Sequence, residues 1–427
     1  MNRGMERNER VIKSTITHIT MEVKETLKKL REDFPENPEG MGYFYELFEK
    51  VYSERKQRRN VKRIIGTLCI QVPEELIYAA GAIPLRLCSG SYSFEQIGSE
   101  MMPAKSCGLV KATVGMLSLI NDLYSDPLDL IVIPTTCDQK KKAGEMLEEM
   151  GLKVYFLEIP SRKDTEAART YWQASVWRFL NTLGEITGKR FTKKSIGDAI
   201  KIYNRAREEF RIFQGLRKAM PSPIYGKDAI LITNAFFFDE IETWIEALTR
   251  LNNELSKRVS RAVHVSMKRP VRILLTGSPS IFPNLKLPLI IEQAGGVIVA
   301  DDFCSSNRLL HDAVAFDEKD LYDMVPAIAD RYLRPCTCPF ITGNHDRRRR
   351  ILSMIRDFDV DGVVYQAFSG CHLFEMEHKS IGKALEEAGI PMLYIETDYS
   401  PEDTGPLSTR VEAFLESIRN SKRKLRL

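Results

Sequence analysis

The feature that most constrains the fold of this chain is a set of eight short, almost continuously apolar segments that alternate with helical sequence. They are predicted at residues 64–71, 83–88, 128–136, 153–160, 271–279, 297–304, 361–368 and 391–398. Strands that are apolar on both faces and alternate with helices form parallel sheets covered by helices on both sides. The sequence therefore predicts an α/β protein with two doubly wound, flavodoxin- or Rossmann-like parallel sheets.

The sequence before and between these two groups of strands is charged and helical in character. Residues 1–60 show this pattern with breaks at Pro35, Pro38 and Gly40, and residues 164–262 contain almost no strand pattern. A chain of 427 residues is long enough for several domains. We predict an N-terminal helical region at 1–60, a first α/β domain at 61–163, a helical region at 164–265 and a second α/β domain at 266–427.

Charge and hydropathy argue against two classes of partner. Lys and Arg number 62 against 58 Asp and Glu, and a formal charge of +4 is too small to indicate a nucleic-acid binder. No run of eighteen apolar residues occurs, and the first thirty residues do not resemble a signal peptide. We therefore expect a cytoplasmic protein that contacts neither nucleic acid nor membrane. In that reducing compartment the eight cysteines are expected to be inert thiols or ligands rather than disulfides.

Four of the cysteines follow predicted strands instead of lying inside them. Cys88, Cys137, Cys304 and Cys371 come at or just after strand ends, two in each predicted α/β domain. Ligands of open parallel sheets bind outside the carboxyl ends of the strands. These four thiols are therefore predicted to face one cleft between the two domains.

The other four cysteines occupy different settings. Cys107 begins a predicted helix, where the free N–H groups and the dipole favour a thiolate. Cys336 and Cys338 lie in the Pro-flanked loop RPCTCPF. Cys69 falls inside the first predicted strand and is interpreted as a buried core thiol.

This distribution leaves three kinds of chemistry open. Structural zinc usually requires closely spaced cysteine pairs, and only Cys336 and Cys338 are so close. A nucleophilic cysteine needs a neighbouring base, which His372 offers to Cys371. Widely spaced cysteines that converge from two domains favour an iron–sulfur cluster held by thiolates. With Cys69 and one thiol of the RPCTCPF loop set aside, six thiolates fit two cubanes with three protein ligands each and one open iron on each cubane.

Six blocks of sequence in order carry a resemblance to a known family. The blocks are PEELIYAAGAIPLRL, PTTCDQKKK, DDFCSSNR, RYLRPC, DGVVYQAFSGCH and GIPMLYIETDY. Together they span most of residues 61–420 and are similar to subunits of 2-hydroxyacyl-CoA dehydratases and benzoyl-CoA reductases. The chain most resembles the double-cubane cluster branch of that family.

The resemblance implies a cofactor and a ligand set. Cys107, Cys137 and Cys371 match the three cysteines that hold a [4Fe-4S] cluster in the dehydratases. The double-cubane branch implies a second set, Cys88, Cys304 and Cys336, with Cys338 as the alternative to Cys336. The implied cofactor is then an [8Fe-9S] double cubane, and the implied assembly is a homodimer. The alternative is a dehydratase subunit with a single [4Fe-4S] cluster.

The same resemblance implies that electrons come from a separate ATP-hydrolysing iron–sulfur activator. The sequence agrees, because it contains neither a P-loop motif nor a dinucleotide-binding G-x-G-x-x-G. The predicted function is thus a reductase of small, hard-to-reduce molecules, typical of anaerobic metabolism. A redox-neutral acyl-CoA dehydratase subunit is the second hypothesis, and a nonenzymatic metal scaffold is the third.

Charged residues suggest where the activator docks and where protons enter. The basic runs at 55–63, 140–142 and 347–350 are either docking sites or solvated helix faces. Lys140 to Lys142 directly follow Cys137, so their charge is expected to ease electron entry into an anionic cluster. His372, Glu375 and Glu377 are the candidate proton donors.

Overall fold

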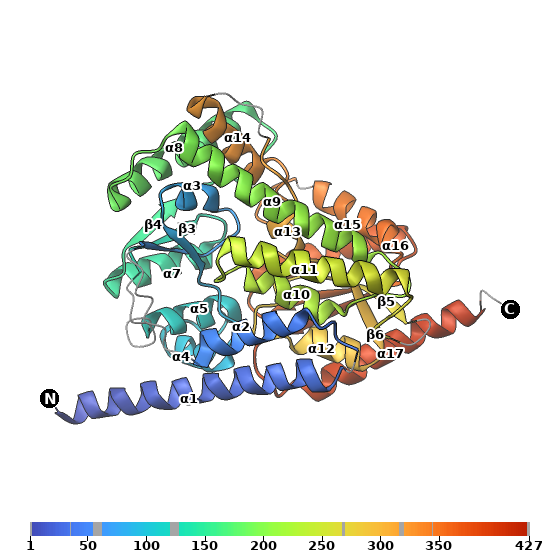
Figure 1. The fold of residues 1–427 in the computed structure, drawn as a ribbon. Coiled ribbons are helices and arrows are strands. Elements are labelled where there is room, and N and C mark those ends of the chain that lie inside the picture. The colour runs from blue at the N-terminus through green and yellow to red at the C-terminus, as the bar shows by residue number, and fades with distance from the viewer. Residues whose placement is uncertain are drawn as a thin grey trace.

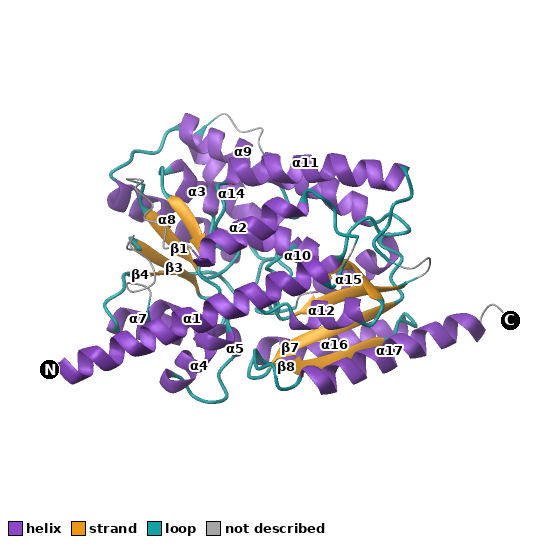
Figure 2. Ribbon diagram, turned by 60° about the horizontal axis from the view of Figure 1, so that its bottom comes forward, coloured by secondary structure: helices purple, strands orange, loops and turns teal. Residues whose placement is uncertain are grey.

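The computed structural model describes residues 2–34, 36–53, 62–119, 128–266, 270–315, 320–343 and 345–424. Two four-stranded parallel sheets lie at opposite sides of the molecule, with helices around and between them (Figures 1 and 2). The strands are β1 (Ile64–Thr67), β2 (Ile83–Arg86), β3 (Leu130–Pro134), β4 (Val154–Leu157), β5 (Val271–Gly277), β6 (Gly296–Asp302), β7 (Gly362–Phe368) and β8 (Met392–Thr397). The predicted fold class is confirmed.

Both sheets have the same strand order. The first runs β2-β1-β3-β4 and the second β6-β5-β7-β8, and every neighbouring pair is parallel. In each sheet the order therefore reverses beside the first strand, between β1 and β3 and between β5 and β7. The loops that leave the carboxyl ends of these central strands diverge at this point, which makes it the usual ligand site of an open α/β sheet.

Helices make up most of the remaining described chain. In the first half they are α1 (Asn2–Glu32), α2 (Met41–Ser53), α3 (Glu74–Ala79), α4 (Tyr92–Met101), α5 (Gly108–Ser118) and α7 (Asp138–Glu149). The middle of the chain forms α8 (Glu166–Thr187), α9 (Lys193–Arg217), α10 (Gly226–Ala235) and α11 (Ile241–Ser260). The last are α12 (Lys286–Gln293), α13 (Asn307–Leu310), α14 (Leu321–Leu333), α15 (His345–Asp357), α16 (His372–Glu387) and α17 (Thr404–Lys424).

In β3 and β7, successive apolar residues enter different cores, as the period of a strand requires. In β3, Leu130 and Val132 join the core made with α3, α8 and α14, whereas Ile131 and Ile133 join the core made with α5 and α7. In the second sheet, β7 likewise divides its side chains between α15 and α16 on one face and α12 and α17 on the other. Burial on both faces explains why the strands read as continuous apolar runs.

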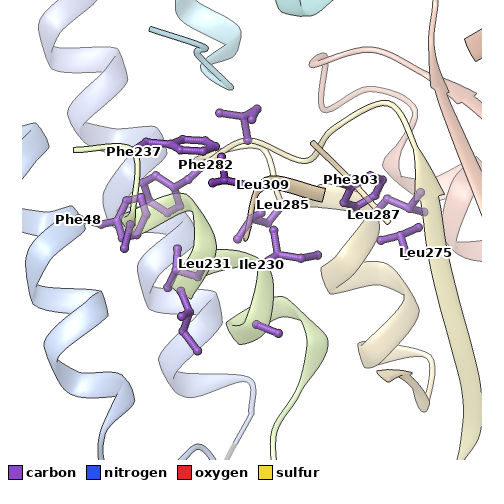
Figure 3. Packing of buried hydrophobic residues seen from close by; sticks show 14 of the residues in the cluster. Phe48, Ile230, Leu231, Phe237, Leu275, Phe282, Leu285, Leu287, Phe303 and Leu309 are labelled. Carbon is purple, nitrogen blue, oxygen red and sulfur yellow. The ribbon is translucent and has the colours of Figure 1, made fainter. Parts of the chain in front are cut away.

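The largest core connects the second sheet to the helices that precede it. Figure 3 shows Phe48 of α2, Ile230 of α10 and Leu287 of α12 packed in one layer that reaches Leu275 of β5 and Phe303 just after β6. Phe303 is the residue directly before Cys304. The loop that carries this cysteine is therefore held from behind by a dry, fully packed core.

Helix α9 ties the two sheets together. It crosses the molecule beside α11 (Figure 1). Near its middle, Arg207 is paired with Glu75 of α3, and at its end Arg217 donates to Asp301 of β6 at 2.7 Å. All four side chains are buried. Removing one partner of such a pair leaves a buried charge without compensation, so these pairs fix where the sheets lie relative to each other.

Helix α14 follows β6 in the sequence but packs against helices that cover the first sheet. Trp172 of α8 donates to the Ala329 carbonyl at 2.7 Å, and Arg169 forms a two-pronged ion pair with Asp330. The loop after α14 therefore returns to the junction between the sheets. This crossover positions Cys336 and Cys338.

The prediction from the sequence did not include every element of the structure. Helix α4 was not predicted, although Ser91 caps it by accepting from the Phe94 N–H. The boundaries of the four proposed domains remain a prediction. Among the described residues, no helix combines the length and apolar character needed to cross a bilayer.

Candidate metal centre

The carboxyl ends of the two sheets meet at a tight junction. A Cβ atom on Gly90, just past β2, would lie 1.8 Å from the Ile281 carbonyl oxygen, which belongs to the loop after β5. A Cβ atom on Gly370, after β7, would lie 2.2 Å from the Lys105 carbonyl oxygen, and its φ of +79° also favours glycine. Both contacts join a loop of one half to a loop of the other, beside predicted ligand cysteines.

The prediction that Cys69 lies inside the first strand is wrong. Pairing of β1 ends at Thr67, and the chain then turns, with the Val72 N–H directed at the Cys69 carbonyl oxygen at 3.4 Å. Pro73, which has no N–H, precedes α3 directly. The apolar residues after Thr67 are buried by the junction and not by the sheet. Cys69 therefore lies at the carboxyl end of a central strand, as Cys137 does after β3.

Cys107, Cys137 and Cys371 share one local setting. They are the N-cap residues of α5, α7 and α16, respectively. Backbone N–H groups in the first turn of each helix lower the pKa of the cysteine that precedes it. These N–H groups and the helix dipole stabilise a thiolate. The first implied cysteine set thus has a common means of holding negative charge.

Gln139 connects the loops of this set. Its side-chain oxygen accepts from the Cys107 N–H at 2.7 Å, and its side-chain nitrogen donates to the Gly370 carbonyl at 2.8 Å. The residue lies two positions after Cys137 and so bridges all three loops. Sequence reasoning did not single it out, although it belongs to the block PTTCDQKKK.

Cys107 and Cys371 are close enough for their thiols to interact directly. The Cys107 thiol donates a hydrogen bond to Cys371, which lowers the pKa of Cys371 to about 7 and raises that of Cys107. The Ser278 hydroxyl, after β5, also lowers the pKa of Cys371 by hydrogen bonding. Cys371 is therefore the more easily ionised thiol of the two.

The second implied set lies in loops without helix N-termini. Burial raises the pKa of Cys88 and of Cys304, and each of these residues is within electrostatic range of the other. Cys336 accepts from the Gln71 side-chain nitrogen at 3.1 Å, and burial raises its pKa to about 11. Cys338 has an additional electrostatic link to Cys304. The structure thus brings both residues of the RPCTCPF loop to the junction.

Cys69 is within electrostatic range of both sets. Its neighbours include Cys88 and Cys304 on one side and Cys137 on the other. Burial raises the pKa of Cys69, but Lys140, a backbone N–H of Gln71 and Arg86 outweigh burial, so the net pKa is lowered. All eight cysteines thus gather at one junction.

Three cations stand among these sulfurs. Lys140 lines a small apolar cavity together with Cys88, and four cysteines raise its pKa against the effect of burial. Arg86 is paired with Glu74 at 2.6 Å and is also within electrostatic range of Cys88. Arg308 is only 3% exposed and lies near Cys304 and Cys338. By contrast, Lys141 and Lys142 form exposed pairs with Asp138 and Glu145.

The donor set fits an iron–sulfur cluster. Burial opposes ionisation of most of these thiols. Bound iron ions would stabilise the thiolate form of these cysteines by compensating its negative charge. The buried Nε, Nη1 and Nη2 atoms of Arg308 find no acceptor within hydrogen-bonding distance in the described parts of the chain. No three Cys, His, Asp or Glu side chains of the described residues converge on one point for a single ion. Thiolates of a cubane bind different irons and need no such point.

The three candidate proton donors have different surroundings. His372 has a side chain that is 70% exposed, with its Nδ1 atom 3.3 Å from Glu375. Glu375 also accepts from the Gly370 N–H at 2.6 Å. Glu377 instead binds Arg347 at 2.7 Å and accepts from the Tyr365 hydroxyl at 2.7 Å. His372 and Glu375 therefore pair with each other beside the loop of Cys371, whereas Glu377 is held by an arginine.

The reading of residues 347–350 as a docking site or a solvated face is wrong for two of its arginines. Arg347 is fully buried and contacts Asp302, Glu377 and Thr276. Arg350 is largely buried and lies 3.3 Å from Asp302. The buried carboxylate of Asp302 explains both orientations, because it attracts the guanidinium groups inward. Residues 55–61 of the first basic run lie outside the described residues.

The chain is similar to known proteins over most of its length. The family described as 2-hydroxyglutaryl-CoA dehydratase, D-component, matches residues 69–418. The chain is similar to the putative dehydratase subunit YjiM of Escherichia coli (strain K12), with 32% identity that covers 83% of this chain and 91% of the relative. It is also similar to the (R)-2-hydroxyglutaryl-CoA dehydratase subunit beta of Acidaminococcus fermentans, with 26% identity over 87% and 98% of the two chains.

A further relative carries the name of a reductase. A benzoyl-CoA reductase subunit of Thauera aromatica is 24% identical over 84% of this chain and 91% of its own. The matched residues include every cysteine of the junction, since they run from residue 69 to residue 418. The resemblance drawn from the six sequence blocks is therefore confirmed. The chain belongs to the family of 2-hydroxyglutaryl-CoA dehydratase D-components.

Proposed function

We propose that this chain is an iron–sulfur oxidoreductase that uses a double-cubane [8Fe-9S] cluster to reduce small, hard-to-reduce molecules. A separate ATP-hydrolysing iron–sulfur activator supplies the electrons, and the chain acts as a homodimer. When bound, the cluster supplies low-potential electron transfer and open metal positions. The proposed ligands are Cys88, Cys107, Cys137, Cys304, Cys336 and Cys371, with Cys338 as the alternative to Cys336.

One observation carries this proposal: cysteines from loops of both sheets gather at a single junction. Three of them cap helices, and the others lie among Lys140, Arg86 and Arg308. A catalytic dyad needs only one thiol and one base. A nonenzymatic scaffold does not need several buried cations beside its cysteines. A cluster that carries several thiolates needs both the sulfurs and the compensating charge.

The residues around the junction have separable roles in this proposal. Lys140, Arg86 and Arg308 stabilise negative charge, and Gln139 holds the loops of the first cysteine set in place. The pair of exposed His372 and half-buried Glu375 is suited to pass protons from solvent toward the loop of Cys371. Glu377 is assigned to the ion pair with Arg347.

The alternative is a 2-hydroxyacyl-CoA dehydratase subunit with one [4Fe-4S] cluster. The names of the relatives favour it, and so does the shared N-cap setting of Cys107, Cys137 and Cys371. Dehydration is redox-neutral overall and returns its electron, whereas reduction consumes electrons in every turnover. The two functions therefore differ in electron demand.

An anaerobic assay with the activator and MgATP tests the proposal. The reductase function predicts that this chain is reduced only when ATP is hydrolysed, and that electrons are then consumed in proportion to product. A 2-hydroxyacyl-CoA should remain unchanged. Conversion of the 2-hydroxyacyl-CoA to the enoyl-CoA with only catalytic amounts of reductant would instead establish the dehydratase.

Replacing Lys140 should lower the reduction potential of the bound cluster. Its ammonium group is the cation with the most cysteine neighbours, and a unit charge a few ångströms away contributes about 2–3 kcal/mol at an effective dielectric constant of about 20. For a one-electron step this corresponds to roughly 100 mV, so Lys140→Met should shift the potential down by that order. An EPR-monitored redox titration measures the shift.

Lys141→Met is the matched control for this experiment. Lys141 has the same charge and the same helix but forms an exposed pair with Asp138. Its replacement should leave the potential within the error of the titration. A Lys140→Met potential equal to that of the wild type would show that Lys140 does not act on the cluster.

A further inference from the structure

A small polar cavity lies beside the RPCTCPF loop. Its volume is about 20 Å³, enough for one small ion or one or two waters. The cavity is lined by Ile70, Gln71, Arg308, Asp312, Arg331, Tyr332, Pro335, Cys336, Thr337, Cys338 and Arg350. Three guanidinium groups and the loop of Cys336 and Cys338 thus line the same cavity.

Three side chains of this cavity carry buried donors that make no hydrogen bond within the described residues. In the described parts of the chain, Arg308 has three buried side-chain nitrogens without a hydrogen bond, and Arg350 has two. The buried Thr337 hydroxyl also makes no hydrogen bond there. Arg308 and Arg350 approach Asp302 at 3.9 and 3.3 Å, outside the geometry of a good hydrogen bond for Arg308. Unsatisfied buried donors are costly and rare in folded proteins.

The charge around the cavity is positive. Arg308, Arg331 and Arg350 face two carboxylates, Asp302 and Asp312. Asp302 is shared with Arg347, and Asp312 lies 2.9 Å from the His311 ring. Arg331 donates to the Leu309 and Asp312 carbonyls. The guanidinium groups that remain to be satisfied are those of Arg308 and Arg350.

We propose that this cavity binds a small planar oxyanion, such as a short carboxylate, through Arg308, Arg350 and Thr337. A planar guanidinium presents parallel N–H groups that match the two oxygens of such an anion. The cavity is too small for a phosphate ester or a coenzyme A chain. This inference rests on the proposed function and deepens it, because it assigns the reductase a substrate class beside its second cysteine set.

Formate is the probe, because it is planar and small and presents two oxygens to a guanidinium group. Calorimetric titration of the anaerobically purified chain at constant ionic strength should show one formate site. Arg350→Gln should weaken binding by about tenfold, and Thr337→Val by about threefold, as expected for a charged and a neutral hydrogen bond. Circular dichroism shows whether each variant is folded. If one variant fails to fold, formate binding by the other still tests the proposal.

Arg356→Gln is the matched control. Arg356 lies on the same helix, α15, and is exposed, so its replacement makes the same change in net charge without touching the cavity. Formate affinity should stay at the wild-type value. Equal weakening in this variant, or wild-type affinity in both Arg350→Gln and Thr337→Val, would overturn the proposal.

A second outcome would also overturn it. If Arg308 and Arg350 pair only with the cluster, formate should not bind at all, and Arg350→Gln should instead shift the reduction potential. Iron and sulfide are determined on the same preparation, which separates the two proposals. Iron without a formate site removes only this inference, whereas a formate site without iron removes the proposed function and with it the assignment of a substrate class, and leaves only an anion site.

Discussion

Replacing Cys137 with alanine should reduce the iron content from about eight irons per chain to about four or fewer. Cys137 caps α7 at the carboxyl end of a central strand, and it lies within electrostatic range of Cys69 and Cys371. A cubane with three protein ligands keeps only two when one of them is replaced. Two thiolates hold the cubane less firmly than three, so iron should be lost from it. Iron and sulfide per chain, measured anaerobically, give the result.

Cys69→Ala provides the comparison for this experiment. It removes the same group from the same junction, but Cys69 stands outside the proposed set of six ligands. It should retain full iron. Full retention in Cys137→Ala, or an equal loss in Cys69→Ala, would contradict the six-thiolate assignment.

Replacing Arg347 with methionine should lower the free energy of unfolding by about 3–5 kcal/mol, the usual cost of breaking a buried ion pair. The side chain is 1% exposed, and it holds Glu377 at 2.7 Å and Thr276 at 3.2 Å as well as Asp302. Methionine fills much of the same volume but leaves the two carboxylates buried without this cation. Urea denaturation followed by circular dichroism measures the change.

Arg349→Met is the control for this measurement. Arg349 is 79% exposed and pairs with Asp346 on the same helix. Exposed pairs contribute at most about 1 kcal/mol, so this variant should unfold nearly as the wild type does. If Arg347→Met were no less stable than Arg349→Met, the ion network around Asp302 would not support the second sheet as described.

Much of this fold could be predicted from the sequence because its strands are buried on both faces. Each of the eight strands falls within or next to a predicted apolar segment. The cysteines after β2, β3, β6 and β7 were found by the same rule, since a parallel sheet places the carboxyl ends of its strands at one edge. The position of Cys107 at a helix start was also predicted correctly.

The parts that failed depend on contacts between distant residues. Cys69 looked like a strand residue because the apolar run continues past Thr67, yet the pairing partners end there. Arg347 looked exposed because a run of arginines normally faces solvent, yet Asp302, far away in the sequence, draws it inward. Local patterns carry no information about such partners.

The route of α14 is a further case. Its sequence follows β6, but its apolar face packs on α8 and α9 over the first sheet. The loop with Cys336 and Cys338 therefore reaches the junction from the helices that cover the first sheet, although it follows β6 of the second sheet in the sequence. Replacing each of the two cysteines and measuring iron will show which of them is the sixth ligand.

The proposed function depends on thiolates from both sheets holding one shared inorganic centre. The decisive measurement is the content of iron and acid-labile sulfide in the chain purified without oxygen, with EPR of the reduced protein. We expect about eight irons and about nine sulfides per chain. About four irons would establish the single-cubane dehydratase instead, and zinc without sulfide would contradict the redox assignment altogether.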